Sequence, residues 1–308
     1  MQDLISIALA CYNGEKFLAE QLDSIFNQTY KNLEVIASDD NSTDLTIEIL
    51  EKYSKSHNLK IVINNDKRGV IYNFQNALKN TTGKYLAFAD QDDVWFPDKI
   101  EKSIKLLMQN KNENLPQMVF SDLIVADQNL TVLQQSYMVA KKLNPTNSFL
   151  SQLLIENIST GCTIVMNQSL KNLLQDIPND IEMHDVYIAI VASCFGKLYY
   201  LPESTMYYRQ HQNNVIGLSN KSLLESIVTT IKPNIKDKEF LLKQMLQANG
   251  IVKHYKSLLT TDQIKILEGF ANLTNMSRKD RILFLYKNKF FKGTKLKTLN
   301  FYYKAVML

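Results

Sequence analysis

The chain has 308 residues, of which 45% are hydrophobic, and it carries a formal net charge of +4 at pH 7. This composition supplies a substantial core, and nine glycines and six prolines are too few for a largely disordered chain. The small net charge does not indicate a nucleic-acid-binding protein, although lysines concentrate near the C-terminus. The length fits one α/β domain of about 200 to 250 residues with a tail, or two domains.

The cysteines and the N-terminus predict a cytoplasmic protein. Cys11, Cys162 and Cys194 are odd in number, widely spaced and embedded in apolar segments, so we expect reduced core residues rather than disulfides or a zinc site. The first strand-like segment begins at Leu4, which leaves no room for a basic leader and an apolar signal region. No apolar run reaches the roughly 18 residues that a membrane-spanning helix needs.

The first hundred residues alternate between strand-like and helix-like patterns. Strands are expected at residues 4–10, 33–38, 60–63 and 85–89, with helices at 17–26, 45–53 and 71–79 between them. This alternation predicts a parallel sheet with right-handed crossovers. Further strands are expected at 118–125, at 163–166 and at 197–201, the last ending at Pro202, with helices at 181–193 and from 221 onward.

Polar clusters follow three of the predicted strands. They are Tyr12-Asn13-Gly14, the segment 39–42 with its two aspartates, and the segment 90–93 with three. In parallel sheets, ligands bind outside the carboxyl ends of the strands, where loops and helix N-termini converge. We therefore expect the three clusters to face one crevice.

The acidic cluster predicts a metal site. Asp90, Asp92 and Asp93 crowd three carboxylates into four residues at the end of an apolar strand. Mg²⁺ or Mn²⁺ takes oxygen ligands and commonly combines one or two protein carboxylates with the oxygens of a substrate phosphate. The alternative is a solvated acidic turn in which Asp93 or Asp98 caps the next helix and Pro97 occupies an early helical position.

Taken together with Thr82-Gly83-Lys84-Tyr85, these clusters resemble the family-2 inverting glycosyltransferases of GT-A fold over roughly residues 3–217. The segments 159–162, 184–185 and 208–214 resemble the branch that contains bacterial rhamnosyltransferase-type enzymes of surface-polysaccharide assembly. The resemblance implies an α/β fold with a Rossmann-like mixed, mostly parallel sheet flanked by helices.

The resemblance also implies a domain organisation. Residues 1–217 would form the catalytic domain, with a nucleotide-sugar-binding half at 1–100 and an acceptor-binding half at 101–217. Residues 218–308 would form a helical extension rich in basic and aromatic residues.

By the same resemblance, Asp40 with Asp39 beside it would recognise the pyrimidine of a nucleotide-sugar, and Tyr12 and Asn13 would form the floor near the base. Arg68, or its neighbour in the same loop, would meet the nucleotide or its phosphate. Simpler roles stay open for all of them. The 39–44 segment can cap a helix, the 12–14 segment can be a plain turn, and a basic loop residue can be solvated.

The D-x-D pattern of the family maps onto Asp90, which would lie near the ribose, and Asp92, which would hold the metal with Asp90 close by. Arg209 and His211 follow a predicted strand, where they would contact the diphosphate or complete the metal shell. The alternative is a surface loop with a structural arginine.

Asp185 is the candidate general base, because it matches the acidic position usually written Glu-Asp in the family. His184 replaces the glutamate here, which leaves its role open. An inverting displacement places the base on the face opposite the leaving diphosphate. The alternative role of Asp185 is to cap the helix predicted at 186–193.

The C-terminal segment 278–308 mixes lysines with aromatic residues. Such a mixture suits the surface of an anionic membrane and a lipid-linked acceptor. It equally suits a pair of helices that pack on the catalytic domain with solvated lysines.

These patterns predict a metal-dependent inverting glycosyltransferase that uses Mn²⁺ or Mg²⁺. It would move a sugar from a UDP- or dTDP-sugar to a hydroxyl of a glycan or lipid-linked oligosaccharide in bacterial capsule, O-antigen or lipooligosaccharide assembly. One alternative is a sugar nucleotidyltransferase, although the Gly-rich, Arg-containing phosphate loop of such enzymes is missing after the first strand. The other is a non-catalytic nucleotide-sugar or glycan-binding module. A dinucleotide-dependent dehydrogenase is disfavoured because no G-x-G-x-x-G follows that strand.

Overall fold

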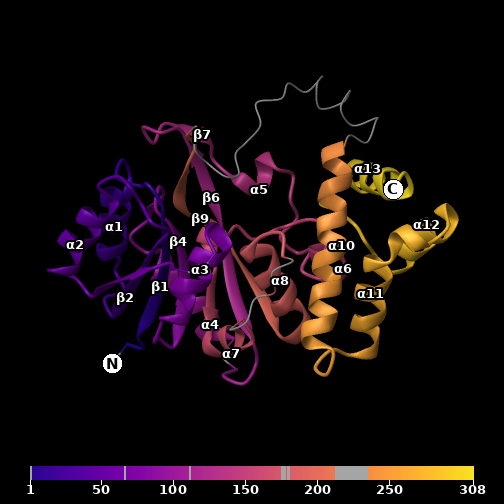
Figure 1. The fold of residues 1–308 in the computed structure, drawn as a ribbon, viewed down its shortest axis with the longest axis horizontal. Helices are drawn as coiled ribbons and strands as arrows, with labels where there is room; N and C mark the ends of the chain where they lie inside the picture. Colours follow the sequence, from indigo (N-terminus) through magenta and orange to yellow (C-terminus); the bar gives the residue numbers. More distant parts are fainter. Residues whose placement is uncertain (1, 66, 111, 175–177, 179–180, 212–234) are drawn as a thin grey trace. The chain divides into compact units, whose positions relative to one another are not determined.

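The computed structural model describes residues 2–308 except 66, 111, 175–177, 179–180 and 212–234 (Figure 1). Its packing separates two compact units. The sheet unit comprises Met1–Ala140, Ser159–Ile177 and Gly196–Asn213, and the helical unit comprises Lys141–Ile158, Pro178–Phe195 and Asn214–Leu308. The functional division expected at residue 217 stays a prediction.

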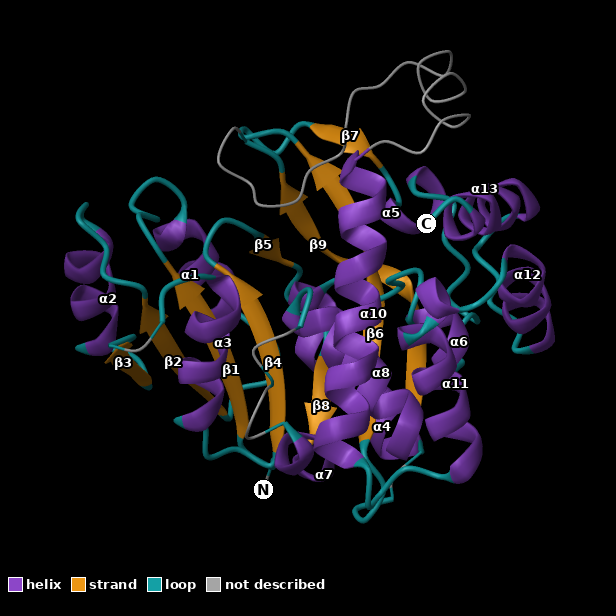
Figure 2. Ribbon diagram, turned by 45° about the vertical axis from the view of Figure 1, so that its right-hand side comes forward, coloured by secondary structure: helices purple, strands orange, loops and turns teal. Residues whose placement is uncertain are grey.

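The sheet unit is built on a nine-stranded mixed sheet with the order β3-β2-β1-β4-β8-β6-β9-β5, in which β7 also pairs with β6. Four of its strands are parallel neighbours and lie side by side in Figure 2, namely β1 (Ile5–Cys11), β2 (Leu33–Asp39), β3 (Leu59–Ile63) and β4 (Tyr85–Asp90). The helices between them are α1 (Leu18–Phe26), α2 (Thr46–Ser54) and α3 (Val70–Lys79). The predicted alternation of strands and helices is confirmed, and so is the parallel arrangement of these strands.

The register brings the carboxyl ends of these strands level. Cys11 at the end of β1 pairs with Asp39 of β2, and Ala10 pairs with Asp90 of β4. Apart from the half-buried Ala10, β1 is buried along its whole length, as expected for a strand with both faces covered. A rigid strand therefore positions the polar side chains at this edge.

The second half of the sheet is mixed. It contains β5 (Val94–Trp95), β6 (Gln117–Ala126), β7 (Val132–Gln134), β8 (Val165–Asn167) and β9 (Lys197–Arg209), accompanied by α4 (Lys99–Gln109), α5 (Tyr137–Ala140) and α7 (Gln168–Leu173). Strand β8 is antiparallel to β4 and β6, whereas β9 is parallel to β6.

Two expected strand boundaries were wrong. The strand expected to end at Pro202 continues to Arg209, because the register shifts after Leu201 and resumes at Ser204, so Pro202 is not required to donate in the ladder. The strand expected from Thr163 begins at Val165, because Gly161–Thr163 forms a turn of 3₁₀-helix, η1.

The helical unit contains α6 (Leu150–Leu153), α8 (His184–Phe195), α10 (Ile235–Tyr255), α11 (Thr261–Ala271), η2 (Leu273–Asn275), α12 (Arg278–Lys287) and α13 (Lys295–Val306). Helix α10 packs on α11 and α13, and the hydroxyl of Tyr187 donates to that of Tyr255 at 3.0 Å. Phe290 and Phe301 of the C-terminal segment are buried, and the ring of Phe290 stacks on that of Phe270 of α11 at 5.2 Å, so part of this segment packs within the helical unit. The part of the helix expected from residue 221 that precedes 235 lies outside the described residues.

The three cysteines are free, with Cys11 and Cys162 buried and Cys194 half-buried. Among the described residues, no helix is both long and apolar enough to span a bilayer.

Candidate functional site

The loop after β1 is joined to the loop after β2. The backbone N–H of Asn13 donates to the hydroxyl of Ser42 at 2.9 Å, and the N–H of Thr43 donates to Asn13 Oδ1 at 2.9 Å. Asn13 has a φ of 46°, in the left-handed region that asparagine tolerates better than most residues. These bonds fix the loop, while the Tyr12 side chain stays 51% exposed at the edge of the sheet.

Gln91 connects the acidic cluster to the same loop. Its Oε1 accepts from the N–H of Tyr12 at 2.8 Å, and its Nε2 donates to the carbonyl oxygen of Tyr12 at 2.9 Å. A Cβ added at Gly14 would lie 2.2 Å from Gln91 Oε1, so the glycine leaves room for this amide. Sequence reasoning missed Gln91, since nothing in the D-Q-D-D pattern indicates its partner.

The two aspartates at the carboxyl end of β2 are buried and make different hydrogen bonds. Asp39 Oδ2 accepts from the N–H of Ser42 at 2.8 Å, a bond within the loop that leads to α2. Asp40 Oδ1 accepts from Asn64 Nδ2 at 2.7 Å, and its Oδ2 accepts from the N–H of Gly69 at 2.8 Å. Asp40 therefore holds the loop that carries the exposed Arg68.

Asn64 was not identified from the sequence. It directly follows β3, so the search for polar residues after parallel strands could have found it.

The structure brings Asp92 and His211 together at the carboxyl edge of the sheet. Asp92 Oδ2 lies 2.7 Å from His211 Nε2, and the two side chains are 15% and 14% exposed. The ring of Phe17 lies 5.0 Å from the imidazole. A partly exposed carboxylate oxygen and imidazole nitrogen are suitable ligands for a divalent cation, so the residues present fit the expected metal. The rest of the predicted motif, 212–214, lies outside the described residues.

A second cluster of possible metal ligands is more buried than the Asp92–His211 pair. Ligand atoms of Asp90, Asp93 and Cys162 lie within 4.8 Å of one another, and the Asp93 and Cys162 side chains are fully buried. Burial raises the pKa of Asp93 well above its usual range, and the charges of Asp92 and Asp90 raise it further. Burial likewise raises the pKa of the Cys162 thiol. A thiolate is a soft ligand, whereas Mg²⁺ and Mn²⁺ prefer oxygen ligands, so the cluster that includes Cys162 suits these ions less well than the Asp92–His211 pair does.

Lys99 lies fully buried beside this cluster. Its Nζ donates to the carbonyl oxygen of Cys162 at 2.7 Å and lies 4.7 Å from the ring of Trp95. Burial lowers the pKa of Lys99 to about 8, while the charges of Cys162 and Asp93 oppose that shift. Sequence reasoning missed Lys99, although a cation as the first residue of α4 is unfavourable to the helix dipole and could have marked it.

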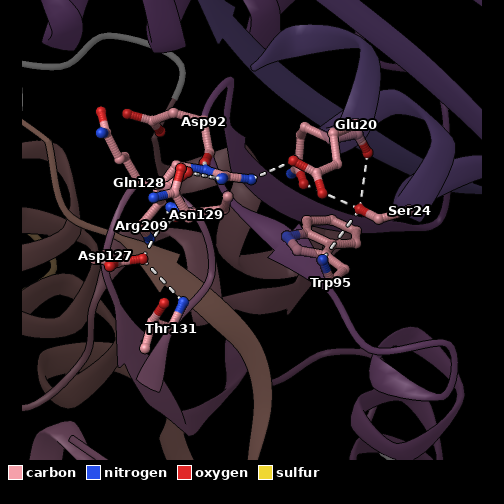
Figure 3. A network of polar contacts seen from close by, with 11 residues as sticks. Glu20, Ser24, Asp92, Trp95, Asp127, Gln128, Asn129, Thr131 and Arg209 are labelled. Carbon is pink, nitrogen blue, oxygen red and sulfur yellow. Dashed lines mark hydrogen bonds and ion pairs between the residues drawn. The ribbon is translucent and has the colours of Figure 1, made fainter. Parts of the chain in front are cut away.

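Arg209, the last residue of β9, is 2% exposed and lies at the centre of the polar network in Figure 3. Its Nε donates to the carbonyl oxygen of Asp92 at 2.7 Å, its Nη1 donates to the carbonyl oxygen of Gln128, and its Nη2 pairs with the Glu20 carboxylate. The guanidinium also lies 4.5 Å from the ring of Phe17. These are the contacts of the structural arginine considered as the alternative, and the role on the diphosphate stays a prediction.

Asp185 lies in the first turn of α8, in the helical unit. Its Oδ1 accepts from the N–H of Val186 at 2.7 Å, its Oδ2 accepts from Asn157 Nδ2 at 2.9 Å, and it is 6% exposed. The helix begins at His184 rather than at residue 181 as expected. Burial lowers the pKa of His184, and the charge of Asp185 opposes that shift.

Glu182 lies near Asp185 and was missed. Burial, followed by the charge of Asp185, raises the pKa of Glu182 to about 7, against the opposing charges of Lys243 and Lys292. Its Oε2 has no hydrogen-bond partner among the described residues.

Residues 6–174, more than half of the chain, match the family model described as Glycosyl transferase family 2. The chain belongs to glycosyl transferase family 2. This glycosyltransferase is 31% identical over 229 residues to the dTDP-rhamnosyl transferase RfbG of Shigella flexneri, covering 68% of this chain and 73% of RfbG. It is 30% identical over 170 residues to WfgD of Escherichia coli, named as a UDP-Glc:α-D-GlcNAc-diphosphoundecaprenol β-1,3-glucosyltransferase, covering 55% and 62%.

Solved structures agree with the fold of the glycosyltransferase. S. aureus TarS 1–349 in complex with UDP-GlcNAc has a TM-score of 0.54 at 17% identity, covering 98% of this chain and 90% of TarS. The mannosyltransferase PcManGT of Pyrobaculum calidifontis, in complex with GDP-Man and Mn²⁺, has a TM-score of 0.53 at 16% identity, covering 100% and 86%. The predicted family and the GT-A fold are therefore confirmed.

Proposed function

We propose that this glycosyltransferase is metal-dependent and inverting, and that it transfers a sugar from a UDP- or dTDP-sugar to a hydroxyl of a lipid-linked glycan. The observation that carries the proposal is the Asp92–His211 pair at the carboxyl edge of the parallel sheet, next to the joined loops after β1 and β2. RfbG is named for a dTDP-sugar and WfgD for a UDP-sugar with a diphosphoundecaprenol-linked acceptor. These names support the proposed donors and the proposed lipid-linked acceptor.

The donor would bind to residues that the edge of the sheet holds in place. The exposed ring of Tyr12, on a loop fixed by Asn13, offers an aromatic face to the base. Asp40, with Asp39 beside it, would recognise the N3–H of the pyrimidine, and the exposed Arg68 would contact the phosphates. Each of these side chains comes from a loop at the same edge of the sheet.

Asp92 and His211, with Asp90 close by, would hold Mn²⁺ or Mg²⁺. When bound, the ion would stabilise the negative charge that develops on the departing diphosphate oxygen. Arg209 would act as a positioning residue, since its Nε fixes the backbone of Asp92 and its own N–H donates to Asp93 Oδ1 at 3.2 Å.

Asp185 would accept the proton of the attacking acceptor hydroxyl. The N–H of Val186 and the amide of Asn157 donate to its two oxygens and orient the carboxylate. It lies in the first turn of α8, so the helix fixes the position of its backbone.

We further propose a cytoplasmic protein that acts in bacterial capsule, O-antigen or lipooligosaccharide assembly and contacts the inner membrane peripherally. Along α13, the apolar side chains of Leu296, Leu299 and Tyr303 are 70%, 65% and 42% exposed at helical spacing. Neighbouring lysines would add attraction to anionic lipid. No role with nucleic acid is proposed.

The proposal can be tested by replacing Asp185, the proposed catalytic base. Asp185→Asn keeps the size of the side chain and removes its basicity, so we expect transfer to fall by about 100-fold or more. Donor binding, measured by calorimetry on the full chain, should stay within about twofold of wild type. A non-catalytic binding module would need no base, and unchanged biological activity of Asp185→Asn would favour that alternative.

A further inference from the structure

The helical unit contains a cavity of about 310 Å³ that the proposed donor and metal sites do not use. It is lined by Lys292, Lys297 and Lys304, by the carboxylates of Glu156 and Asp237, and by apolar and amide side chains of α10 and α13. The volume is at the lower end of the range of ligand pockets, which is about 300 to 1,000 Å³. With three cations against two anions, the lining carries one positive charge in excess.

Two of the three lysines form ion pairs with carboxylates of the lining. Lys297 Nζ contacts Glu156 Oε1 at 2.7 Å and the carbonyl oxygens of Lys141 and Lys142 at 2.7 and 3.1 Å, which uses its three hydrogens. Lys304 Nζ contacts Asp237 Oδ1 at 2.8 Å and has no further acceptor among the described residues. Lys297 is therefore structural, whereas Lys304 can donate to a ligand.

Lys292 carries the excess charge. Among the described residues, no acceptor lies within hydrogen-bond distance of its ammonium group, which lies 5.5 Å from the ring of Phe301. Its backbone is nevertheless fixed, since its N–H donates to Thr298 Oγ1 at 2.9 Å and the next N–H, that of Gly293, donates to Glu156 Oε2 at 2.6 Å. These bonds anchor the backbone of Lys292 at the cavity, while its flexible side chain can adjust to a ligand.

The surroundings disfavour this cation in the absence of a ligand. Burial lowers the pKa of Lys292 to about 8. The charges of Lys297 and Lys304 lower it further, whereas those of Glu156 and Glu182 raise it. Lys292 is half-buried, and a cation that is partly shielded from water without a partner costs stability, which an anion bound in the cavity would offset. Asn300, which also lines the cavity, has a buried Oδ1 with no partner among the described residues, so a second polar group is available to a ligand.

We propose that this cavity binds a phosphate-bearing anion, with Lys292 and Lys304 as its donors. An ammonium group is a compact point charge that suits phosphate oxygens. The anion could be a soluble diphosphate or the headgroup of an anionic lipid, and both present the same oxygens. The proposal rests on the residues that line the cavity and not on the proposed function. The cavity is separate from the residues proposed for the donor, so either proposal can fail without the other.

The test measures acylation of individual lysines in the full chain at pH 7.5 by peptide mass spectrometry. The exposed Lys295 of the same segment is the internal control. Inorganic pyrophosphate at roughly four times its dissociation constant should slow labelling of Lys292 about fivefold and leave Lys295 unchanged. Parallel arms use vesicles of phosphatidylglycerol with phosphatidylcholine and vesicles of phosphatidylcholine alone.

Protection by pyrophosphate would identify a soluble diphosphate as sufficient, and protection by phosphatidylglycerol vesicles alone would identify a lipid headgroup. Unchanged labelling of Lys292 in every arm would overturn the proposal. As a second measurement, with UDP present to occupy the donor site, pyrophosphate should raise the Tm of wild type and of Lys295→Met but not that of Lys292→Met. An equal shift in all three proteins would also overturn it.

Discussion

At the scale of single residues, burial rather than residue type distinguishes the titratable groups of this glycosyltransferase. Asp93 and Glu182 both retain protons to a higher pH than ordinary carboxyl groups, because burial disfavours their charged forms. Lys99 and Lys292 both lose protons at a lower pH than an ordinary lysine for the same reason. The stability of the protein should therefore depend on pH through a few identifiable side chains.

Replacing Glu182 with Gln tests one of these side chains. In the folded protein its pKa is about 7, against 4.5 ordinarily, so wild type loses stability as pH rises through 7 while the variant does not. We expect Glu182→Gln to raise the free energy of unfolding by on the order of 3 kcal/mol at pH 8.5, and by under about 1 kcal/mol at pH 5.

Urea denaturation at the two pH values measures this difference, and Glu239→Gln, at an exposed position on α10, is the matched control. An equal effect of Glu182→Gln at pH 5 and pH 8.5 would contradict the assignment.

The sequence located the residues that follow strands, because the position of a polar side chain at a strand end is a local signal. Asp39, Asp40, Asp90 and Asp92 all lie at the edge where they were expected. The buried charges could not be found this way. Whether Lys99 is solvated or buried depends on β9, a segment about a hundred residues away that packs against α4.

At the scale of elements, β9 is longer than expected, and its extra residues position side chains of the candidate site. Its continuation past Pro202 carries Arg209 and His211 to the acidic end of β4. Arg209 then joins α1, through Glu20, to the backbone of Asp92 and to the turn that contains Gln128. The proline misled the sequence interpretation because a register shift, which has no local signature, removes the requirement for its missing N–H.

Arg209→Lys tests whether this network is structural. A single ammonium group cannot reproduce the fork of donors that contacts Glu20, Gln128 and Asp92 together. We expect thermal and chemical denaturation to show a loss of about 2 to 4 kcal/mol in the free energy of unfolding. Arg68→Lys, at an exposed position, should lose under about 0.5 kcal/mol. If Arg209→Lys were as stable as wild type but bound the donor weakly, the arginine would be a ligand of the diphosphate instead.

At the scale of the whole molecule, local patterns predicted that the first four strands form a parallel sheet, but not the order of the strands in it. Sequential βα units pair with near neighbours along the chain in β3-β2-β1, whereas the pairing of β1 with β4 and the order β8-β6-β9-β5 depend on distant contacts. The same holds for the helical unit, which includes the internal segments 141–158 and 178–195. Its cavity joins α10, α13 and Glu156, so its position also depends on distant contacts.

A divalent cation held by Asp92 and His211 should support binding of the donor diphosphate. Calorimetry of UDP-glucose and dTDP-rhamnose with the full chain, in Mn²⁺ and in EDTA, measures this effect. For the preferred donor, Mn²⁺ should raise the affinity of wild type and of the control Asp98→Asn about tenfold or more, or about 1.4 kcal/mol, with no gain in Asp92→Asn. Equal affinity of wild type in Mn²⁺ and in EDTA would show that donor binding does not depend on a cation at Asp92 and His211.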